Sequence, residues 1–422
     1  MRRRVIVVFL VVAVMTFAAG FSASAAQDET APIINTGWLE RDTLIGDWGG
    51  VRPWLKERGV TLMPRLTQFY QGMTSGDGDS DFEYGSKADL LLNADLSKLG
   101  LWKGLSLTVH GEYNFGESVN GYGGTGVPVN TALAFPGIEG QDAYDFSSVY
   151  FKQMLGDSIS LSLGKINIVD VCAVKPFHGG DGIDSFWNAT FVVPPSGTVP
   201  AYIFGAMLSV RTEAATYGLW IYDPNSAVNK SGFERPFDDV TIRGNVSFPV
   251  TIAGLSGHQG FAASYSTKHG NEGESQDDIL VPSFRSGIKN DRYYVNYTFD
   301  QYLYQSKENP KEGVGLFGQF GISDGNPNPL HWSAFGGLQG TGLIPGRSHD
   351  NWGVGYYYDA WSNNLKDSFE SIITIRDEQG WEIFYNFAVT PWLVLGADLQ
   401  IIEPSLANDT AVFFGLRTVI RF

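Results

Sequence analysis

The sequence is poor in the groups that build disulfide frameworks, metal clusters and hydrolytic active sites. It contains a single cysteine, Cys172, so neither an intrachain disulfide nor a thiolate metal cluster can form. Its six histidines are scattered, and neither a Gly-x-Ser-x-Gly nor a His-Glu-x-x-His motif occurs. We therefore predict no catalytic residues, no cofactor and no metal ion.

Long hydrophobic runs are also missing, except at the start of the chain. Residues 1–4 give a basic start, residues 5–19 are almost entirely apolar, and Ala23-Ser24-Ala25 has the small-x-small pattern that signal peptidases cut. A membrane anchor helix needs about 20 apolar residues, more than this run offers. We therefore interpret residues 1–25 as a signal peptide and expect the protein to be exported.

Positive charge is scarce. The chain has 29 basic and 45 acidic residues, a net charge of −16. Loss of Arg2, Arg3 and Arg4 with the signal peptide leaves 26 basic residues and a net charge of −19. This acidity argues against nucleic acid as a partner and disfavours an anion channel, whose pore carries an excess of lysine and arginine.

What the sequence does contain is a repeated alternation of polar and apolar residues. From residue 60 onward it forms sixteen segments of about ten residues, the first at 60–71 and the last at 410–422. This is the length and period of tilted strands that cross a membrane. We predict an all-β fold over residues 60–422, a closed antiparallel transmembrane β-barrel of about sixteen strands, which is wide enough for an aqueous channel.

The last segment gives the clearest alternation and ends on an aromatic residue, Phe422. It resembles the C-terminal strand by which the barrel assembly machinery recognises outer-membrane proteins. A soluble β-sandwich whose aromatic residues fill a core is the alternative. The export signal and this terminal strand favour a barrel in the lipid of the bacterial outer membrane.

The predicted connections alternate between short and long, as expected when the two barrel ends face the periplasm and the outside. Prolines and glycines in the long connection 170–201 argue against a continuous helix and favour a loop folded into the lumen, which would narrow the pore. Ahead of the first strand, residues 47–59 are typical of a capped short helix that stops at Gly59. We assign residues 26–59 to a segment at the periplasmic end.

Several sequence blocks resemble the carbohydrate-selective porin family, often called the OprB family. They are Leu44-Ile45-Gly46-Asp47-Trp48-Gly49-Gly50-Val51-Arg52, Gly164-Lys165-Ile166-Asn167 with Phe186-Trp187-Asn188, Gly342-Leu343-Ile344-Pro345-Gly346-Arg347, and Leu399-Gln400-Ile401-Ile402-Glu403-Pro404. Their order is that of the family, and they span most of the predicted mature chain. The resemblance implies a sixteen-stranded barrel and passive uptake of sugars such as glucose.

A selective sugar pore needs charged or amide groups that bind hydroxyls and flat aromatic surfaces that bind ring faces. A charge on the lipid side of a strand is costly, by roughly 2 to 4 kcal/mol for a midplane arginine, so charged strand residues are expected to face the lumen. The expected pore-lining residues are Arg65, His110, Glu112, Arg211, Arg243, Arg292, Glu382, Asp398, Gln400 and Arg417. The plainer interpretation is that they only hydrate the lumen wall.

The inward loop adds candidates for the constriction, namely Asp170, Lys175, Asp181, Asp184, Trp187 and Asn188. Trp187 is either a platform for stacking on sugars or an anchor of the loop in the barrel wall.

Two apparent motifs are weaker evidence for a functional site. The run Gly121-x-Gly123-x-x-Gly126 is followed by Pro128 and opens no helix, and residues 77–81 lack the glycine and glutamate of a calcium loop, although loose calcium binding stays open.

Three other functions remain as alternatives. The acidic balance also suits a general cation-preferring porin, the many carboxylates leave an outer-membrane enzyme conceivable, and the acidic long loops are compatible with an adhesin. We predict that the protein is a porin and not an enzyme, with small sugars as its substrates.

Overall fold

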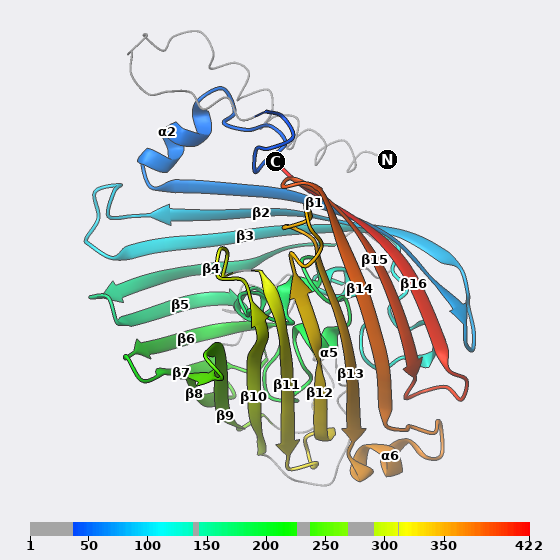
Figure 1. Ribbon diagram of the computed structural model, residues 1–422. Helices are drawn as coiled ribbons and strands as arrows, with labels where there is room; N and C mark the ends of the chain where they lie inside the picture. Colours follow the sequence, from blue (N-terminus) through cyan, green and yellow to red (C-terminus); the bar gives the residue numbers. More distant parts are fainter. Residues whose placement is uncertain (1–36, 138–142, 226–236, 269–290, 311) are drawn as a thin grey trace, which may run out of the picture.

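The computed structural model describes residues 37–137, 143–225, 237–268, 291–310 and 312–422, so the predicted signal peptide lies outside the described residues. In these ranges sixteen strands form one closed barrel (Figure 1). Each strand pairs antiparallel with the next, and β16 closes the ring against β1. The predicted fold is therefore confirmed.

The strand bounds follow the alternating segments of the sequence. The first eight strands are β1 (Val60–Ser75), β2 (Phe82–Asp95), β3 (Leu105–Gly116), β4 (Ala143–Leu155), β5 (Ile159–Asn167), β6 (Tyr202–Arg211), β7 (Thr216–Asp223) and β8 (Thr241–Ile252). The others are β9 (Leu255–Ser266), β10 (Arg292–Gln305), β11 (Gly313–Ser323), β12 (Leu330–Thr341), β13 (Asn351–Trp361), β14 (Glu378–Thr390), β15 (Leu393–Glu403) and β16 (Ala411–Arg421).

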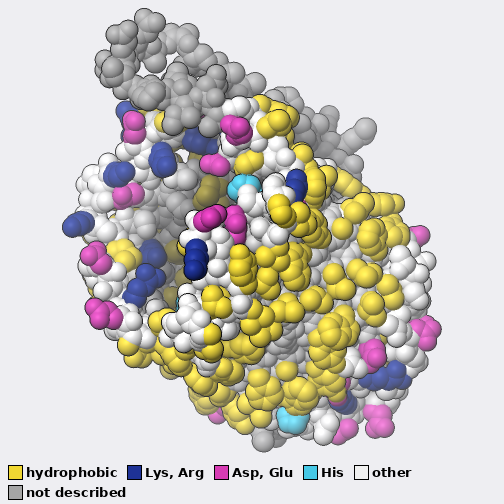
Figure 2. Space-filling model, in the orientation of Figure 1, with side chains coloured by type: hydrophobic (Ala, Val, Ile, Leu, Met, Phe, Trp, Pro, Cys, Tyr) yellow, Lys and Arg dark blue, Asp and Glu magenta, His cyan; other side chains and the backbone are white. Residues whose placement is uncertain are grey.

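Alternation sorts the side chains of each strand between the lumen and the outer surface. On β16, Phe413 and Arg417 are buried on the lumen side, whereas Phe414 and Leu416 are exposed on the outside. Figure 2 shows the result, a broad hydrophobic surface over the barrel wall with charged side chains mainly towards its margins. No helix among the described residues is long and apolar enough to span a membrane.

Two long connections fold into the barrel. The β5–β6 loop, residues 168–201, contains α4 (Ile168–Ala173), η2 (Gly180–Gly182) and α5 (Ala189–Val192), and its apolar side chains pack against the wall. We call it the inward loop (Figure 1). The described part of the β3–β4 connection, residues 117–137 with η1 (Tyr122–Gly124) and α3 (Thr131–Ala134), also buries apolar side chains in the lumen. The sequence predicted the first inward loop but not the second.

Short turns gather at the barrel end that carries the segment preceding β1. Its helix, α2 (Val51–Glu57), stops shortly before Gly59, whose positive φ of 85° ends the helical path as predicted. No side chain caps its N-terminus, because Gly50 occupies that position. The segment is tied to the barrel by Trp392, whose Nε1 donates to the Trp38 carbonyl at 3.0 Å. A further helix, α6 (Asn363–Phe369), lies at the opposite end (Figure 1).

Candidate functional site

Charged side chains form a row across three neighbouring strands at the wall of the lumen. Arg65 on β1 pairs in register with Asp89 on β2, which pairs with Glu112 on β3. Directly paired residues point to the same side of a sheet, and so do residues two apart on one strand. Lys87 and His110 therefore join the row on the same face.

These side chains contact one another closely. Lys87 Nζ lies 2.5 Å from Glu112 Oε1, and Arg65 Nε lies 3.1 Å from Asp89 Oδ2. His110 Nε2 lies 3.2 Å from Asp89 Oδ1. All of them except Arg65 are almost fully buried. Buried charges persist only when they are paired and hydrogen-bonded, so the row acts as one network.

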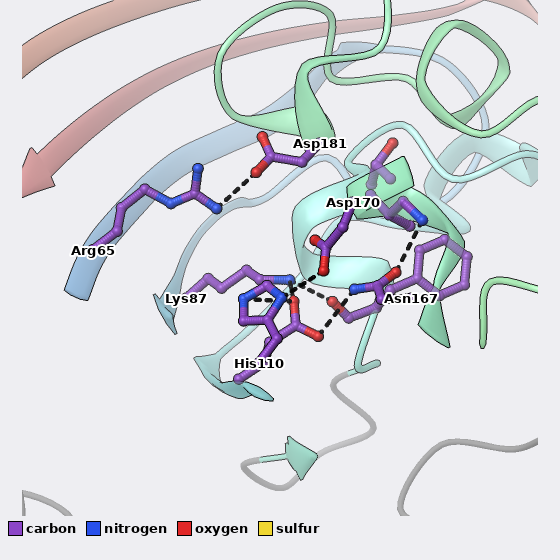
Figure 3. A pocket seen from close by; sticks show the side chains of 10 residues that line it. Arg65, Lys87, His110, Asn167, Asp170 and Asp181 are labelled. Carbon is purple, nitrogen blue, oxygen red and sulfur yellow. Dashed lines mark hydrogen bonds and ion pairs between the residues drawn. The ribbon is translucent and has the colours of Figure 1, made fainter. Parts of the chain in front are cut away.

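The inward loop completes the network from the lumen side (Figure 3). Asp170 on α4 binds His110 Nδ1 at 2.9 Å, and Asp181 in η2 binds Arg65 at 2.7 Å. Asp184 lies 3.9 Å from the same guanidinium and 2.5 Å from that of Arg421. We name these eight residues the constriction cluster: Arg65, Lys87, Asp89, His110, Glu112, Asp170, Asp181 and Asp184.

Local structure explains how the loop presents its carboxylates. The side chain of Asn167 accepts from the Val169 N–H and starts α4, which places Asp170 in the first turn. Asp181 has a positive φ of 52° between two glycines that also have positive φ, a tight turn that points its carboxylate at Arg65. Burial raises the pKa of Asp181 to about 6, although the positive charge of Arg65 opposes this.

Only part of the cluster is open to solutes. The side chain of Arg65 is 16% exposed, that of Asp170 31% and that of Asp184 48%. A cavity between the wall and the loop, lined by Lys87, His110 and Glu112 among others, has a volume of about 10 Å³. This is room for about one water molecule. A sugar can therefore touch the exposed rim of the cluster but cannot enter it.

The structure thus brings together six residues that the sequence nominated: Arg65, His110, Glu112, Asp170, Asp181 and Asp184. Sequence reasoning missed Lys87 and Asp89. Their spacing was the available signal, because residues two apart on a strand share one face, and charged residues on a membrane-crossing strand are expected on the lumen face. Both residues lie inside β2, which begins at Phe82.

A second group of nominated residues anchors the inward loop and does not line open pore. Glu382 on β14 accepts from the backbone N–H groups of Trp187, at 2.5 Å, and Asn188, at 3.0 Å. Gln400 on β15 accepts from the Asn188 side chain at 3.2 Å and also binds Asp398. These side chains are buried under the loop. Their expected contact with solutes is corrected accordingly.

Trp187 and Arg417 belong to the same anchor. The guanidinium of Arg417 lies over the Trp187 ring, 4.8 Å from its centroid, and donates to the Gly182 carbonyl at 2.9 Å. Phe69 meets that ring edge-on at 5.1 Å. Trp187 is fully buried, so it is not the open stacking platform but the alternative, a loop anchor. Gly415 on β16 provides the space, because a Cβ there would lie 2.6 Å from the ring.

The remaining nominated residues are placed outside the constriction cluster. On β8, about half the ring away from β1, the guanidinium of Arg243 lies 5.6 Å from the centroid of the half-buried Trp220 ring and donates to Asn296 at 3.1 Å. Arg292 is buried and donates to the Gly197 carbonyl of the inward loop. Arg211 is exposed at the end of β6. Lys175 is half-buried in the inward loop, where burial lowers the pKa of its ammonium group.

A sixteen-stranded barrel with an apolar outer wall and a charged lumen narrowed by an inward loop defines a porin of the bacterial outer membrane. The model of the carbohydrate-selective porins, OprB family, matches residues 79–422. The chain belongs to this family and is a carbohydrate-selective porin, as the sequence blocks predicted. Its fold and family are those of a transport channel.

Solved structures agree with this assignment of the fold. The high-pH structure of OprB from Pseudomonas putida superposes with a TM-score of 0.77 at 19% identity, over 92% of this chain and 100% of that one. The low-pH structure of the same protein gives a TM-score of 0.58 at 16% identity, over 91% and 99% of the two chains. No curated relative matches the sequence.

Proposed function

We propose that glucose-like sugars diffuse passively through the barrel and are selected at the exposed rim of the constriction cluster. The observation that carries this proposal is the arrangement of Arg65, which is held between Asp89 and Asp181 while part of its side chain faces the lumen. Asp170 and Asp184 add exposed carboxylates beside it. The inward loop and the wall thus offer donors and acceptors within a few ångströms of each other.

This arrangement suits the chemistry of a sugar. Each hydroxyl both donates and accepts a hydrogen bond, so it can replace water at a guanidinium and at a carboxylate together. Because ion pairs already fix these groups, little side-chain freedom is lost when a solute arrives. The contacts must remain weak enough for release, as passive conduction requires.

The aromatic part of the predicted constriction needs a different residue from Trp187, whose ring is buried. We assign it to Trp220 on β7, which lies on the lumen face beside Arg243. A half-exposed indole next to a guanidinium offers an apolar surface for a sugar ring and donors for its hydroxyls.

The test is conductance of the purified barrel in a planar bilayer while glucose, maltose and an uncharged non-sugar of similar size are titrated. We expect saturable block by the sugars and none by the non-sugar. Arg65→Gln should raise the half-blocking glucose concentration about tenfold, since a hydrogen bond to a charged group contributes about 1.5 to 3 kcal/mol. Arg211→Gln, at an exposed strand end, is the matched control and should behave as wild type.

Channels that conduct ions but are blind to every sugar would contradict a sugar-selecting constriction and favour the general cation-preferring porin. We also propose that the barrel passes sugars unchanged. Recovery of intact maltose after incubation with the protein checks this, and release of glucose would instead support the enzyme alternative.

Export and assembly complete the proposal. Residues 1–25 are proposed to be a signal peptide, 26–59 a periplasmic-end segment, and 60–422 the barrel that the assembly machinery recognises through β16 and Phe422. Sequencing the N-terminus of the mature protein tests the first part. Replacing Phe422 by alanine should lower the outer-membrane level in cells without preventing refolding in detergent, whereas unchanged levels would contradict recognition through this residue.

A further inference from the structure

Three side chains of the constriction cluster have the composition and spacing of a metal-ligand set. Asp89, His110 and Glu112 each offer one ligand atom, and these atoms lie within 4.8 Å of one another. The side chains come from the adjacent strands β2 and β3, whose register places Asp89 directly opposite Glu112. Rigid, paired strands hold such a set better than a loop does.

His110 is oriented as a metal ligand would be. Its Nδ1 is held by Asp170 at 2.9 Å (Figure 3). This leaves Nε2 directed at Asp89 Oδ1, 3.2 Å away, and Glu112 Oε1, 4.0 Å away. A histidine that donates Nδ1–H to a carboxylate and presents Nε2 to the ion is the usual arrangement around protein-bound zinc.

The two cations that now neutralise these carboxylates have other partners. Lys87 Nζ also donates to the Phe135 carbonyl at 2.6 Å, and it lies 3.4 Å from that of Ala132. Arg65 also binds Asp181 at 2.7 Å. If a metal ion takes the carboxylates of Glu112 and Asp89, Arg65 therefore keeps its ion pair with Asp181, and Lys87 keeps its hydrogen bonds to backbone carbonyls.

Charge and space favour a small divalent cation. Besides His110, four carboxylates face two cations: Asp89, Glu112, Asp170 and Asp181 against Arg65 and Lys87. The adjoining cavity of about 10 Å³ admits one water-sized species and no sugar. The imidazole nitrogen favours a transition metal over Mg²⁺ or Ca²⁺, which prefer oxygen ligands.

We propose that Asp89, His110 and Glu112 bind one divalent transition-metal ion of the Zn²⁺ type at the pore wall, with Asp170 as a positioning residue on the inward loop. The site joins the second and third strands to the loop that narrows the channel. It differs from the sequence-based expectation that the chain binds no metal. The proposed metal site does not depend on which solute the pore selects.

Calorimetric titration of the untagged, refolded barrel with Zn²⁺ tests the proposal. We expect one site per barrel in the wild type, loss of that site in His110→Gln, and no comparable site for Mg²⁺. The matched control is His258→Gln, since His258 also pairs with a carboxylate, Asp300 at 2.9 Å, but on β9 and β10. This variant should bind Zn²⁺ as the wild type does.

A wild-type barrel that binds no Zn²⁺ would overturn the proposal, and so would wild-type affinity in His110→Gln. Asp170→Asn provides a second readout if His110→Gln fails to refold. Loss of the carboxylate that orients His110 should weaken Zn²⁺ binding about 10- to 100-fold while keeping one site per barrel. Unchanged affinity in that variant would contradict the positioning role.

Discussion

The carboxylate of Glu382 on β14 accepts a hydrogen bond from the backbone N–H of Trp187, a residue 195 positions earlier in the chain, at 2.5 Å. The next N–H, that of Asn188, donates to the other carboxylate oxygen at 3.0 Å. Four residues before Glu382 on the same strand, Glu378 binds the second inward connection in the same way, through the N–H groups of Gly126 and Val127. One strand therefore fixes both segments that fill the lumen.

Replacing Glu382 by alanine should free the inward loop. It removes two hydrogen bonds to a buried acceptor, so we expect the free energy of unfolding to fall by about 3 kcal/mol and the single-channel conductance to rise. Glu382→Gln keeps one acceptor oxygen and should give an intermediate effect. Denaturant unfolding in detergent and bilayer recordings measure both quantities. Glu213→Ala, in the exposed β6–β7 turn, is the control, and equal behaviour of the two alanine variants would contradict the anchoring role.

Ion selectivity should depend on pH through Asp181. Its pKa is raised to about 6, so its negative charge is lost as the pH falls from 7 to 5, and the preference for cations should decrease with a midpoint near pH 6. Because this pKa lies above the usual 3.8, ionisation of Asp181 opposes folding, and its contribution to stability falls as the pH rises from about 4 to 6.

Reversal potentials across a salt gradient measure the selectivity between pH 5 and pH 7. Asp181→Asn should abolish the step, whereas Asp184→Asn should retain it. A step that survives in Asp181→Asn would assign the titration to another group.

Gly415→Ala should displace the inward loop from the wall. The added Cβ would lie 2.6 Å from the Trp187 ring, and overpacking of this kind costs about 1 to 3 kcal/mol. We expect lower stability and a higher, noisier conductance. Gly244→Ala on β8 is the matched control, because nothing lies within 4 Å of a Cβ built there. Wild-type stability and conductance in Gly415→Ala would mean that the ring does not sit where the structure places it.

Trp187 should act on stability and not on sugar binding. Trp187→Ala removes a fully buried indole, which should lower the free energy of unfolding by about 3 to 5 kcal/mol. Trp187→Phe keeps most of the packing, so half-blocking glucose concentrations should stay within about twofold of wild type. Trp220→Phe should raise the half-blocking glucose concentration more than Trp187→Phe does. If Trp187→Phe lost the block by glucose while its conductance stayed unchanged, Trp187 would instead be a platform on which sugars stack.

The barrel itself could be predicted from the sequence because its strands are amphipathic with a period of two. The same alternation correctly placed Arg65, His110 and Glu112 on the lumen side. It could not show which lumen positions the inward loop covers, since that depends on packing between residues far apart in the chain. Glu382, Gln400 and Arg417 therefore seemed open to solutes although they are buried.

Glycines within the strands mark some of the wall positions that the inward segments cover. A glycine inside a strand often marks a close approach of another segment. Gly415 lies against Trp187, and Gly355 on β13 lies against Phe191 of the same loop. The second inward connection is marked in the same way, because a Cβ on Gly85 of β2 would lie 2.5 Å from Leu133 of α3. A glycine shows that another segment comes close but not which segment it is, and the apolar residues of this connection are equally compatible with a loop outside the barrel.

The inward loop follows β5, yet the residues that hold its centre lie on β14, β15 and β16. A partly assembled barrel that lacks these last strands has the loop but not the residues that hold its centre against the wall. Solute discrimination can therefore arise only when the ring is complete, and any product that stops short of the final strands would be an unfiltered leak. A cell that makes this protein gains from rejecting such products before they reach the membrane.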